Sequence, residues 1–243
     1  MTVIEKAAHS ASDTAILAET LPAVFIAFIA KWLSTPHVEV GEKATKVLGD
    51  LLDVDCDRRT IERRMDGIEI TLQRKPGQGL LWQRIFNDRD TYELILELCS
   101  LKNVGEELQL DERQKSLAQA RLLRLLPRLA PFDFRAISRS NFPDVEDSYG
   151  VKGEKGLLWF AAVTMVNKEE DMLMHLTLVD FFVEFLGAVS ATEIGLPALT
   201  YLSKLLKKAM EADELLRQNL ESISVNPESA PELVGLIARL TQA

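Results

Sequence analysis

The sequence has few of the residues on which catalytic and metal centres depend. Only two cysteines and three histidines occur in 243 residues. Cys56 and Cys99 have neither metal-ligand spacing nor a disulfide framework, and His175 lies in an apolar stretch, where a histidine is most often a hydrogen-bonded member of the core. We therefore expect no enzyme, no metal or cofactor site and no small-molecule substrate. The cysteine usage favours a reducing compartment, the cytoplasm and also the nucleus.

Turn-forming residues and long apolar runs are also scarce. Glycine occurs 12 times and proline 9 times, which favours long helices over many short strands. The apolar run Leu21–Ala30 is too short to span a bilayer and follows no basic segment. The formal net charge of −9 argues against direct nucleic-acid binding, since such proteins usually carry a basic footprint. We expect a helical protein that contacts neither membrane nor nucleic acid.

Apolar residues recur at helical spacing along most of the chain. A helix is expected from Leu21 to Ser34, ended by Pro36, and a second over Val38–Leu52. Gly67–Gln73 alternates and fits an edge strand or a helix end equally well. The remaining expected helices begin after Gly79 and after Gly156, or cover Arg89–Ser100, Asp111–Ile137 with a kink or end near Pro127 and Pro131, the apolar stretch from Asp171 to Val189, Leu196–Ile223 and Pro231–Thr241.

The four-residue sequence GLLW occurs twice, at Gly79–Trp82 and Gly156–Trp159. Each copy is expected to open the first helix of a two-helix unit, with the glycine ending the preceding segment and the Leu-Leu-Trp packing in the first turn. The separation is close to two repeats of about 40 residues. One structural part used twice is therefore the favoured interpretation, and a pair of twin binding sites is the alternative.

Helical hairpins joined by short turns are typical of repeat proteins. We expect residues 1–243 to form a single HEAT/armadillo-like repeat domain, an all-α, right-handed α-solenoid of about five helical hairpins. Residues 140–156 are polar and rich in Gly, Pro and Asp, which predicts a loop that is mobile.

Polar residues form a narrow strip on the second helix of each of three units. Steps of three and four keep each set on one helix face. Stacked repeats would align the strips into a concave, mostly acidic ribbon, the surface with which solenoids hold protein partners; ordinary solvated positions are the alternative. The candidate protein-binding residues are Glu39, Lys43, Lys46, Asp50, Asp90, Glu93, Glu97, Thr177, Asp180 and Glu184.

A basic group gives a second candidate surface. Arg58, Arg59, Arg63 and Arg64 lie close together, and in a helix Arg59 and Arg63 would share a face. A solvated helix face and a docking patch for an acidic partner are both compatible with this pattern.

Several segments together resemble a known family. They are PHVEVGEKATKVLGDLLDVD, GLLWQRIFNDRDTYELILELCS and PFDFRAISRSNFPDVEDSYG, with LLWFAAVTMVNKEEDMLMHLTLVDFFVEFL after the last. They look like the fungal chaperones that assemble the base of the proteasome regulatory particle. Some members carry a DNA mismatch repair name, and the metazoan counterpart is a 26S proteasome non-ATPase subunit. The resemblance extends from about Leu21 to Val189. It lies in the overall amino-acid sequence and in the layout of the repeats, not in one short motif. Members are longer, and this chain is similar to their N-terminal half, so it is either a piece of a longer protein or a shorter relative.

The resemblance implies a HEAT/armadillo-type superhelix that binds the C-terminal domain of one AAA+ ATPase and leaves before the finished particle works. On that basis the chain is a non-enzymatic chaperone with a protein partner. Two alternatives remain open. One is a general solenoid adaptor, whose inner helices usually carry regularly spaced Asn or Trp that these strips lack. The other is a mismatch-repair accessory factor, against which the net charge argues.

Overall fold

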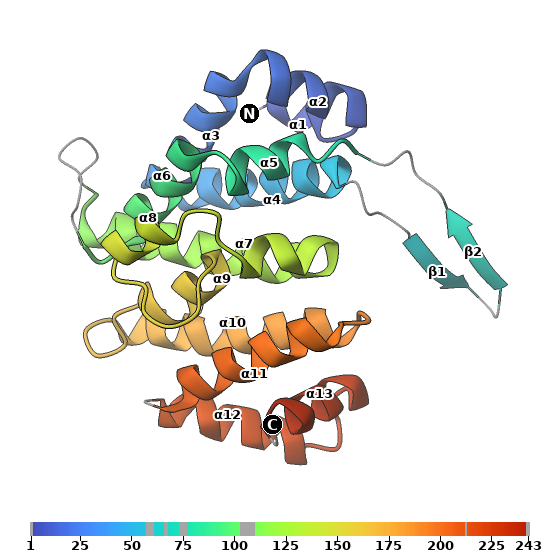
Figure 1. The fold of residues 1–243 in the computed structure, drawn as a ribbon, viewed down its shortest axis with the longest axis vertical. Helices are drawn as coiled ribbons and strands as arrows, with labels where there is room; N and C mark the ends of the chain where they lie inside the picture. Colours follow the sequence, from blue (N-terminus) through green and yellow to red (C-terminus); the bar gives the residue numbers. More distant parts are fainter. Residues whose placement is uncertain are drawn as a thin grey trace.

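The computed structural model shows helices that follow one another along the long axis, with the two termini toward opposite ends (Figure 1). The structure describes residues 2–56, 61–65, 68–72, 77–102, 110–211 and 213–241. The predicted all-α class is confirmed, apart from one β-hairpin. The elements are α1 (Thr2–Ala7), α2 (Ala11–Thr20), α3 (Pro22–Ser34), α4 (Val38–Asp55), β1 (Ile61–Met65), β2 (Ile68–Leu72), α5 (Leu80–Phe86), α6 (Arg89–Cys99), α7 (Glu112–Ser138), α8 (Pro143–Ser148), α9 (Leu157–Trp159), the π-helix η1 (Phe160–Thr164), α10 (Met172–Ser190), α11 (Leu196–Glu211), α12 (Glu214–Val225) and α13 (Pro231–Thr241).

Aspartates set the start of several of these helices. The side chains of Asp88, Asp111, Asp171 and Asp213 each accept a hydrogen bond from a backbone N–H in the first turn of α6, α7, α10 and α12. Such caps satisfy backbone donors that the helix itself leaves unpaired, and each contributes about 1 kcal/mol. The helix after Leu21 begins with Pro22, where a missing N–H costs nothing.

Helices whose labels differ by three pack against each other in the series α4, α7, α10 and α13. Helix α4 contacts α7, α7 contacts α10, and α10 contacts α13, while α3 packs on α6 and α11 on η1. The buried apolar residues form one continuous cluster that runs from α1 to α13. Helix α7, the longest element, thus lies between α4 and α10 at the centre of the stack (Figure 1).

A buried arginine joins α7 to the end of α3. Arg121 is 3% exposed and donates hydrogen bonds to the carbonyl oxygens of Trp32, Leu33 and His37. The last carbonyls of a helix have no intrahelical donor and carry partial negative charge, so a cation placed there is doubly favourable. Gly41 of α4 leaves the space that this guanidinium occupies.

Helix α7 is broken near its end, as its prolines predict. It continues through Pro127, whereas Asp133, two residues after Pro131, has non-helical φ and ψ angles of −148° and 83°. The Asp133 carboxylate then accepts a hydrogen bond from the N–H of Ala136 at 3.0 Å, which restarts the helix. The break redirects the last turn of α7.

The two copies of GLLW are built alike. Gly79 and Gly156 have positive φ angles of 69° and 107°, which favour glycine, and α5 and α9 begin at the next residue. In each copy the buried tryptophan donates its indole N–H to a backbone carbonyl at 2.9 Å: Trp82 to Leu52 and Trp159 to Lys152. A buried carboxylate also accepts backbone N–H groups at each start. These are Asp55, from Leu81 and Trp82, and Glu146, from Gly156.

The predicted loop at 140–156 contains the short helix α8, so the expectation of an irregular segment is wrong for Pro143–Ser148. Glu146 is fully buried and accepts hydrogen bonds from the Tyr92 hydroxyl and the Gly156 N–H. Burial and the adjacent Glu146 carboxylate raise the pKa of Tyr92 well above its usual value. Tyr92 lies 54 residues from Glu146 in sequence, and its hydrogen bond helps to order a stretch whose composition favours a loop. Its mobility stays a prediction.

A β-hairpin projects from the stack between α4 and α5 (Figure 1). Strand β1 pairs antiparallel with β2, with Ile61 opposite Leu72 and Met65 opposite Ile68. Of the two possibilities left open for Gly67–Gln73, the strand is therefore correct for Ile68–Leu72, and Gly67 and Gln73 lie outside the described residues. Backbone hydrogen bonds from Gly77 to Cys56 and from Gly79 to Asp55 join the two ends of the excursion. Helices α1 and α2 are further elements that sequence reasoning did not assign.

Candidate functional site

Half of the charged residues of the predicted strip on α4 form ion pairs within the chain. Lys43 forms an ion pair with Glu5 of α1 at 2.9 Å, and Asp50 pairs with Arg128 of α7 at 2.6 Å. Glu39 and Lys46 are exposed. Two of the four charges on this strip are therefore already paired within the chain.

The strip on α6 lies beside a different neighbour. Asp90 is exposed in the first turn, whereas Glu93 and Glu97 are half-buried. Burial, together with the charges of Glu97 and Glu93, raises the pKa of Tyr149 to about 12. These two carboxylates therefore lie near the segment that follows α8.

The strip on α10 is open to solvent. Asp180 and Glu184 are exposed and form no ion pair with any residue that the structure describes. Thr177 donates its hydroxyl to the carbonyl oxygen of Leu173 one turn earlier. Sequence reasoning missed that the same face continues into exposed apolar residues: Leu173 is 74% and Leu176 is 45% exposed.

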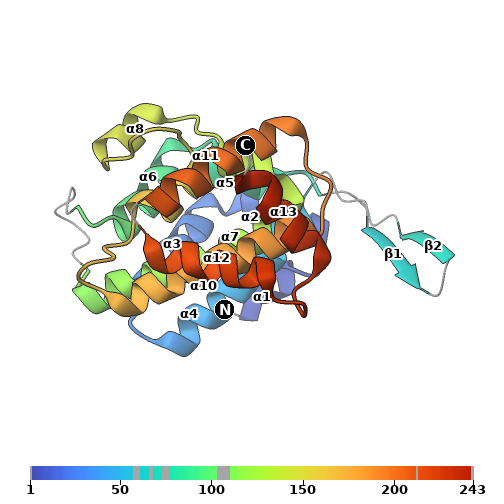
Figure 2. The same ribbon diagram turned by 90° about the horizontal axis from the view of Figure 1, so that it is seen from below.

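The three strips do not lie on neighbouring helices of one row. Helix α7, not α6, stands between α4 and α10. Viewed along the stack in Figure 2, α4 lies at the lower edge and α6 with α8 at the upper left. The sequence-based alignment of α4, α6 and α10 into one ribbon assumed two-helix units, whereas α4, α7, α10 and α13 recur every third helix.

The basic group is described only in part. Arg58 and Arg59 lie outside the described residues, and Arg63 and Arg64 belong to β1, opposite Ile70 and Glu69 of β2. The possibility that this segment is a helix, with Arg59 and Arg63 on one face, is therefore wrong for residues 61–65.

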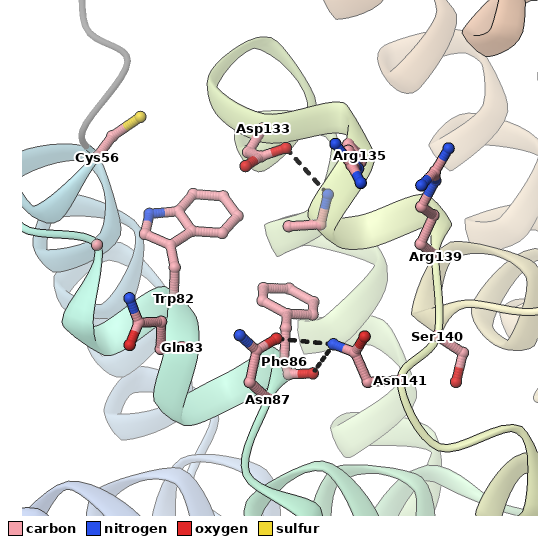
Figure 3. A pocket seen from close by; sticks show the side chains of 12 residues that line it. Cys56, Trp82, Gln83, Phe86, Asn87, Asp133, Arg135, Arg139, Ser140 and Asn141 are labelled. Atoms are coloured by element: carbon pink, nitrogen blue, oxygen red, sulfur yellow. Dashed lines mark hydrogen bonds between the residues drawn. The ribbon is translucent and has the colours of Figure 1, made fainter.

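A cleft of about 440 Å³ separates α5 from the end of α7. Figure 3 shows Trp82, Phe86 and Asn87 on the α5 side, with Asp133, Arg135 and Arg139 on the α7 side. The rings of Trp82 and Phe86 stack with centroids 5.6 Å apart. We call this hollow the α5–α7 cleft.

An amide pair closes one end of the α5–α7 cleft. Asn141 donates its side-chain N–H₂ to the carbonyl oxygen of Phe86 at 2.9 Å and to the amide oxygen of Asn87 at 2.7 Å (Figure 3). The amide nitrogens of Asn87 and Gln83 remain as donors on the α5 side. No residue pattern in the sequence pointed to this cleft, because the break in α7 creates it.

The most buried charged group outside these surfaces has a structural role. The Asp213 carboxylate binds Lys168 at 2.8 Å, His175 at 2.9 Å and the N–H of Leu216 at 2.9 Å. Burial raises its pKa, but the hydrogen bonds from Lys168, Leu216 and His175 outweigh burial and lower the pKa. The prediction that His175 is a hydrogen-bonded histidine is thus confirmed. The cluster holds the start of α12 against α10.

Helix α10 is also the most apolar long helix. By length and composition it could cross a membrane, yet 44% of its most apolar window is buried within the protein; α2 and α3 would pass the same test as one broken span, bent by 96°. Its residues Leu178, Phe182 and Phe185 pack in the core, as those of a core helix do. In the described parts of the chain, no group of three acidic, histidine or cysteine side chains is arranged to hold a metal ion.

Comparison with known proteins gives no match to a family model, a curated protein or a solved structure.

Proposed function

We propose that this chain is a non-enzymatic protein-binding scaffold and that its partner docks on the outward face of α10. The α10 outer face consists of Leu173, Leu176, Asp180 and Glu184, spaced three and four residues apart on one side of the helix. The observation that carries the proposal is that this face is both apolar and acidic and has no described partner, whereas half of the α4 strip is paired within the chain. Isolated exposed leucines are common, but adjacent ones on a helix mark interaction surfaces.

The composition of the face defines the kind of partner. Two exposed leucines, with Met172 beside them at 63% exposure, suit an apolar groove or the apolar stripe of a helix. Asp180 and Glu184 one turn further on call for lysine or arginine on the partner. The same two carboxylates disfavour a lipid surface, because charged groups are costly in a bilayer. A protein surface with apolar contacts flanked by basic residues fits best.

The sequence resemblance supports a specific partner of this kind. We infer that the partner is the C-terminal domain of an AAA+ ATPase of the proteasome regulatory particle, bound during assembly of its base in the cytoplasm or nucleus. The recurrence of α4, α7, α10 and α13 supports the finer fold assignment, a right-handed HEAT/armadillo-like solenoid with these helices as one row. The α10 outer face then lies on that row.

Binding of the purified ATPase C-terminal domain, measured by isothermal titration calorimetry, tests the proposal. Burying a leucine side chain contributes about 1.5–3 kcal/mol, so Leu173→Ser with Leu176→Ser should weaken binding by about 2–4 kcal/mol, or roughly 30- to 1,000-fold. Asp180→Lys with Glu184→Lys should also weaken it, and more strongly at low salt. The matched control is Glu221→Lys with Glu228→Lys, which makes the same charge change at exposed sites elsewhere.

The outcomes test the proposed chaperone role and the proposed α10 docking surface separately. Loss of binding in both α10 variants but not in the control supports both parts of the proposal. Binding that survives in the α10 variants keeps the chaperone role and rejects this face. A folded chain that binds no regulatory-particle ATPase overturns the chaperone role and leaves a general adaptor. Salt-sensitive binding to duplex DNA would favour the mismatch-repair accessory factor instead.

A further inference from the structure

The break in α7 places two arginines on the rim of the α5–α7 cleft. Arg135 lies in the last turn of α7, and Arg139, four residues later, is the first residue after the helix, with extended φ and ψ angles of −116° and 151°. Both are exposed and line the cleft. Figure 3 shows Arg135 on the last turn of α7 and Arg139 where the chain leaves the helix, both on the α7 side of the cleft, opposite Trp82.

Arg135 and Arg139 differ from several other arginines of α6 and α7. Arg89, Arg124 and Arg128 each pair with a carboxylate of another helix. The guanidinium groups of Arg135 and Arg139 form neither an ion pair nor a hydrogen bond with the residues that the structure describes. Their donors are therefore available to a ligand.

The charge around these arginines distinguishes the two sides of the broken turn. Among the described residues, the α5–α7 cleft is lined by two guanidinium groups and one carboxylate, that of Asp133, which accepts the N–H of Ala136. On the other side, facing α11, the same three residues line a second hollow together with Lys204, Glu154 and Glu193, so that three positive charges face three negative ones. Of these two hollows, as lined by described residues, the α5 side is therefore the net positive one, in a chain whose formal net charge is −9.

We propose that the α5–α7 cleft binds an acidic peptide segment of a protein partner. Planar guanidinium groups bind carboxylates through two parallel hydrogen bonds, and two of them on the same side of the cleft can hold acidic side chains at neighbouring positions of an extended peptide. The amide donors of Gln83 and Asn87 line the opposite wall, and the stacked rings of Trp82 and Phe86 offer an apolar floor. This site is separate from the α10 outer face and takes a ligand of opposite charge.

Fluorescence anisotropy with two labelled peptides of the same length tests this proposal on the full chain. The probe is (Ser-Glu)₄, and (Ser-Gln)₄ is its uncharged counterpart. We expect the acidic peptide to bind and the uncharged one not to. Arg135→Gln with Arg139→Gln should weaken binding at least tenfold and flatten its salt dependence. The control, Arg113→Gln with Arg239→Gln, removes two exposed arginines elsewhere and should leave the dissociation constant within twofold.

Three results would overturn the proposal. The first is no binding of (Ser-Glu)₄ to a chain with native circular dichroism. The second is an equal loss in both double variants, which would mean nonspecific attraction. The third is tighter binding of an oligothymidylate of the same charge, which would make the cleft a nucleic-acid site. Asp180→Lys with Glu184→Lys should leave peptide binding intact, so failure of this proposal and failure of the α10 docking surface are distinguishable.

Discussion

Alanine in place of Gly41 tests how α4 and α7 are held together. A Cβ atom at Gly41 would lie 2.1 Å from Nε and 2.3 Å from Cζ of Arg121. That guanidinium is buried and donates to the carbonyl oxygens of Trp32 and Leu33 at 3.0 Å and of His37 at 3.3 Å. The side chain cannot swing into solvent without losing its bonds to the carbonyl oxygens of Trp32 and Leu33, whereas His37 keeps the N–H of Gly41 as a donor. The substitution must therefore either displace the guanidinium or separate the helices.

The expected loss in the free energy of unfolding follows from the hydrogen bonds that Arg121 donates. A bond from a charged donor contributes about 1.5–3 kcal/mol, and the three together, partly retained after relaxation, put about 3–5 kcal/mol at stake. Alanine is favoured over glycine in a helix interior by about 1 kcal/mol, which offsets part of the loss. We therefore expect Gly41→Ala to lower the free energy of unfolding by about 2–4 kcal/mol, a large share of the 5–15 kcal/mol typical of a domain.

Gly49→Ala is the matched control, two helical turns further along α4. There the new Cβ would lie 2.5 Å from a terminal nitrogen of Arg128, but that side chain is 35% exposed and can move outward. We expect a change within about 1 kcal/mol of zero, because propensity gain and a weakened ion pair nearly cancel. Urea unfolding followed by far-UV circular dichroism measures both. The reasoning is refuted if Gly41→Ala is as stable as the parent, or if Gly49→Ala is the more damaging of the two.

Two further predictions concern buried carboxylates. The lowered pKa of Asp213 means that its ionised form stabilises the fold above about pH 4, its usual range, and that this contribution is lost as the pH falls through the lower folded-state value. The stability gap between the parent and Asp213→Asn, measured by urea unfolding from pH 7 to pH 3, should therefore shrink on acidification; a constant gap would contradict this. Glu146→Ala should cost about 2–4 kcal/mol, because it leaves the Tyr92 hydroxyl and the Gly156 N–H without their acceptor, and Glu146→Gln should cost less. Hydrogen exchange of residues 140–156 should be slow in the parent and faster in Glu146→Ala, and fast exchange in both would instead support a mobile loop.

The helices were predictable where apolar spacing and local stop signals agree. Pro22 and Pro36 bracket α3, and the spacing of Val47, Leu48 and Leu51 predicts α4, both of which the structure contains. The glycine that opens each GLLW likewise predicted a helix start, because the feature responsible is local. Periodicity alone did not decide between strand and helix for Gly67–Gln73, since a short alternating run fits both.

The features that the sequence did not predict depend mainly on contacts between different elements of the fold. Helix α8 is ordered by Glu146 and its partners Tyr92 and Gly156, which no local pattern in a polar, glycine-rich stretch can report. The sequence analysis aligned α4, α6 and α10 in one row, and this prediction failed for a related reason. Nothing within α6 shows that it packs on α3, or that α7 takes the place between α4 and α10. The α5–α7 cleft depends on the break at Asp133, whose direction follows from tertiary packing.

The closed base of the β-hairpin has a consequence for how the protein can vary. Because Gly77 bonds to the backbone of Cys56, and a Cβ there would meet the backbone of Asp55 at 2.2 Å, the chain re-enters the stack at the point where it leaves. Backbone hydrogen bonds from Gly77 and Gly79 thus hold the end of α4 and the start of α5 together. Doubling the length of such an excursion costs only about 0.6 kcal/mol in closure entropy. Evolution or an engineer can shorten, enlarge or exchange this appendage, for a reporter or a new recognition element, while the helical stack keeps its packing.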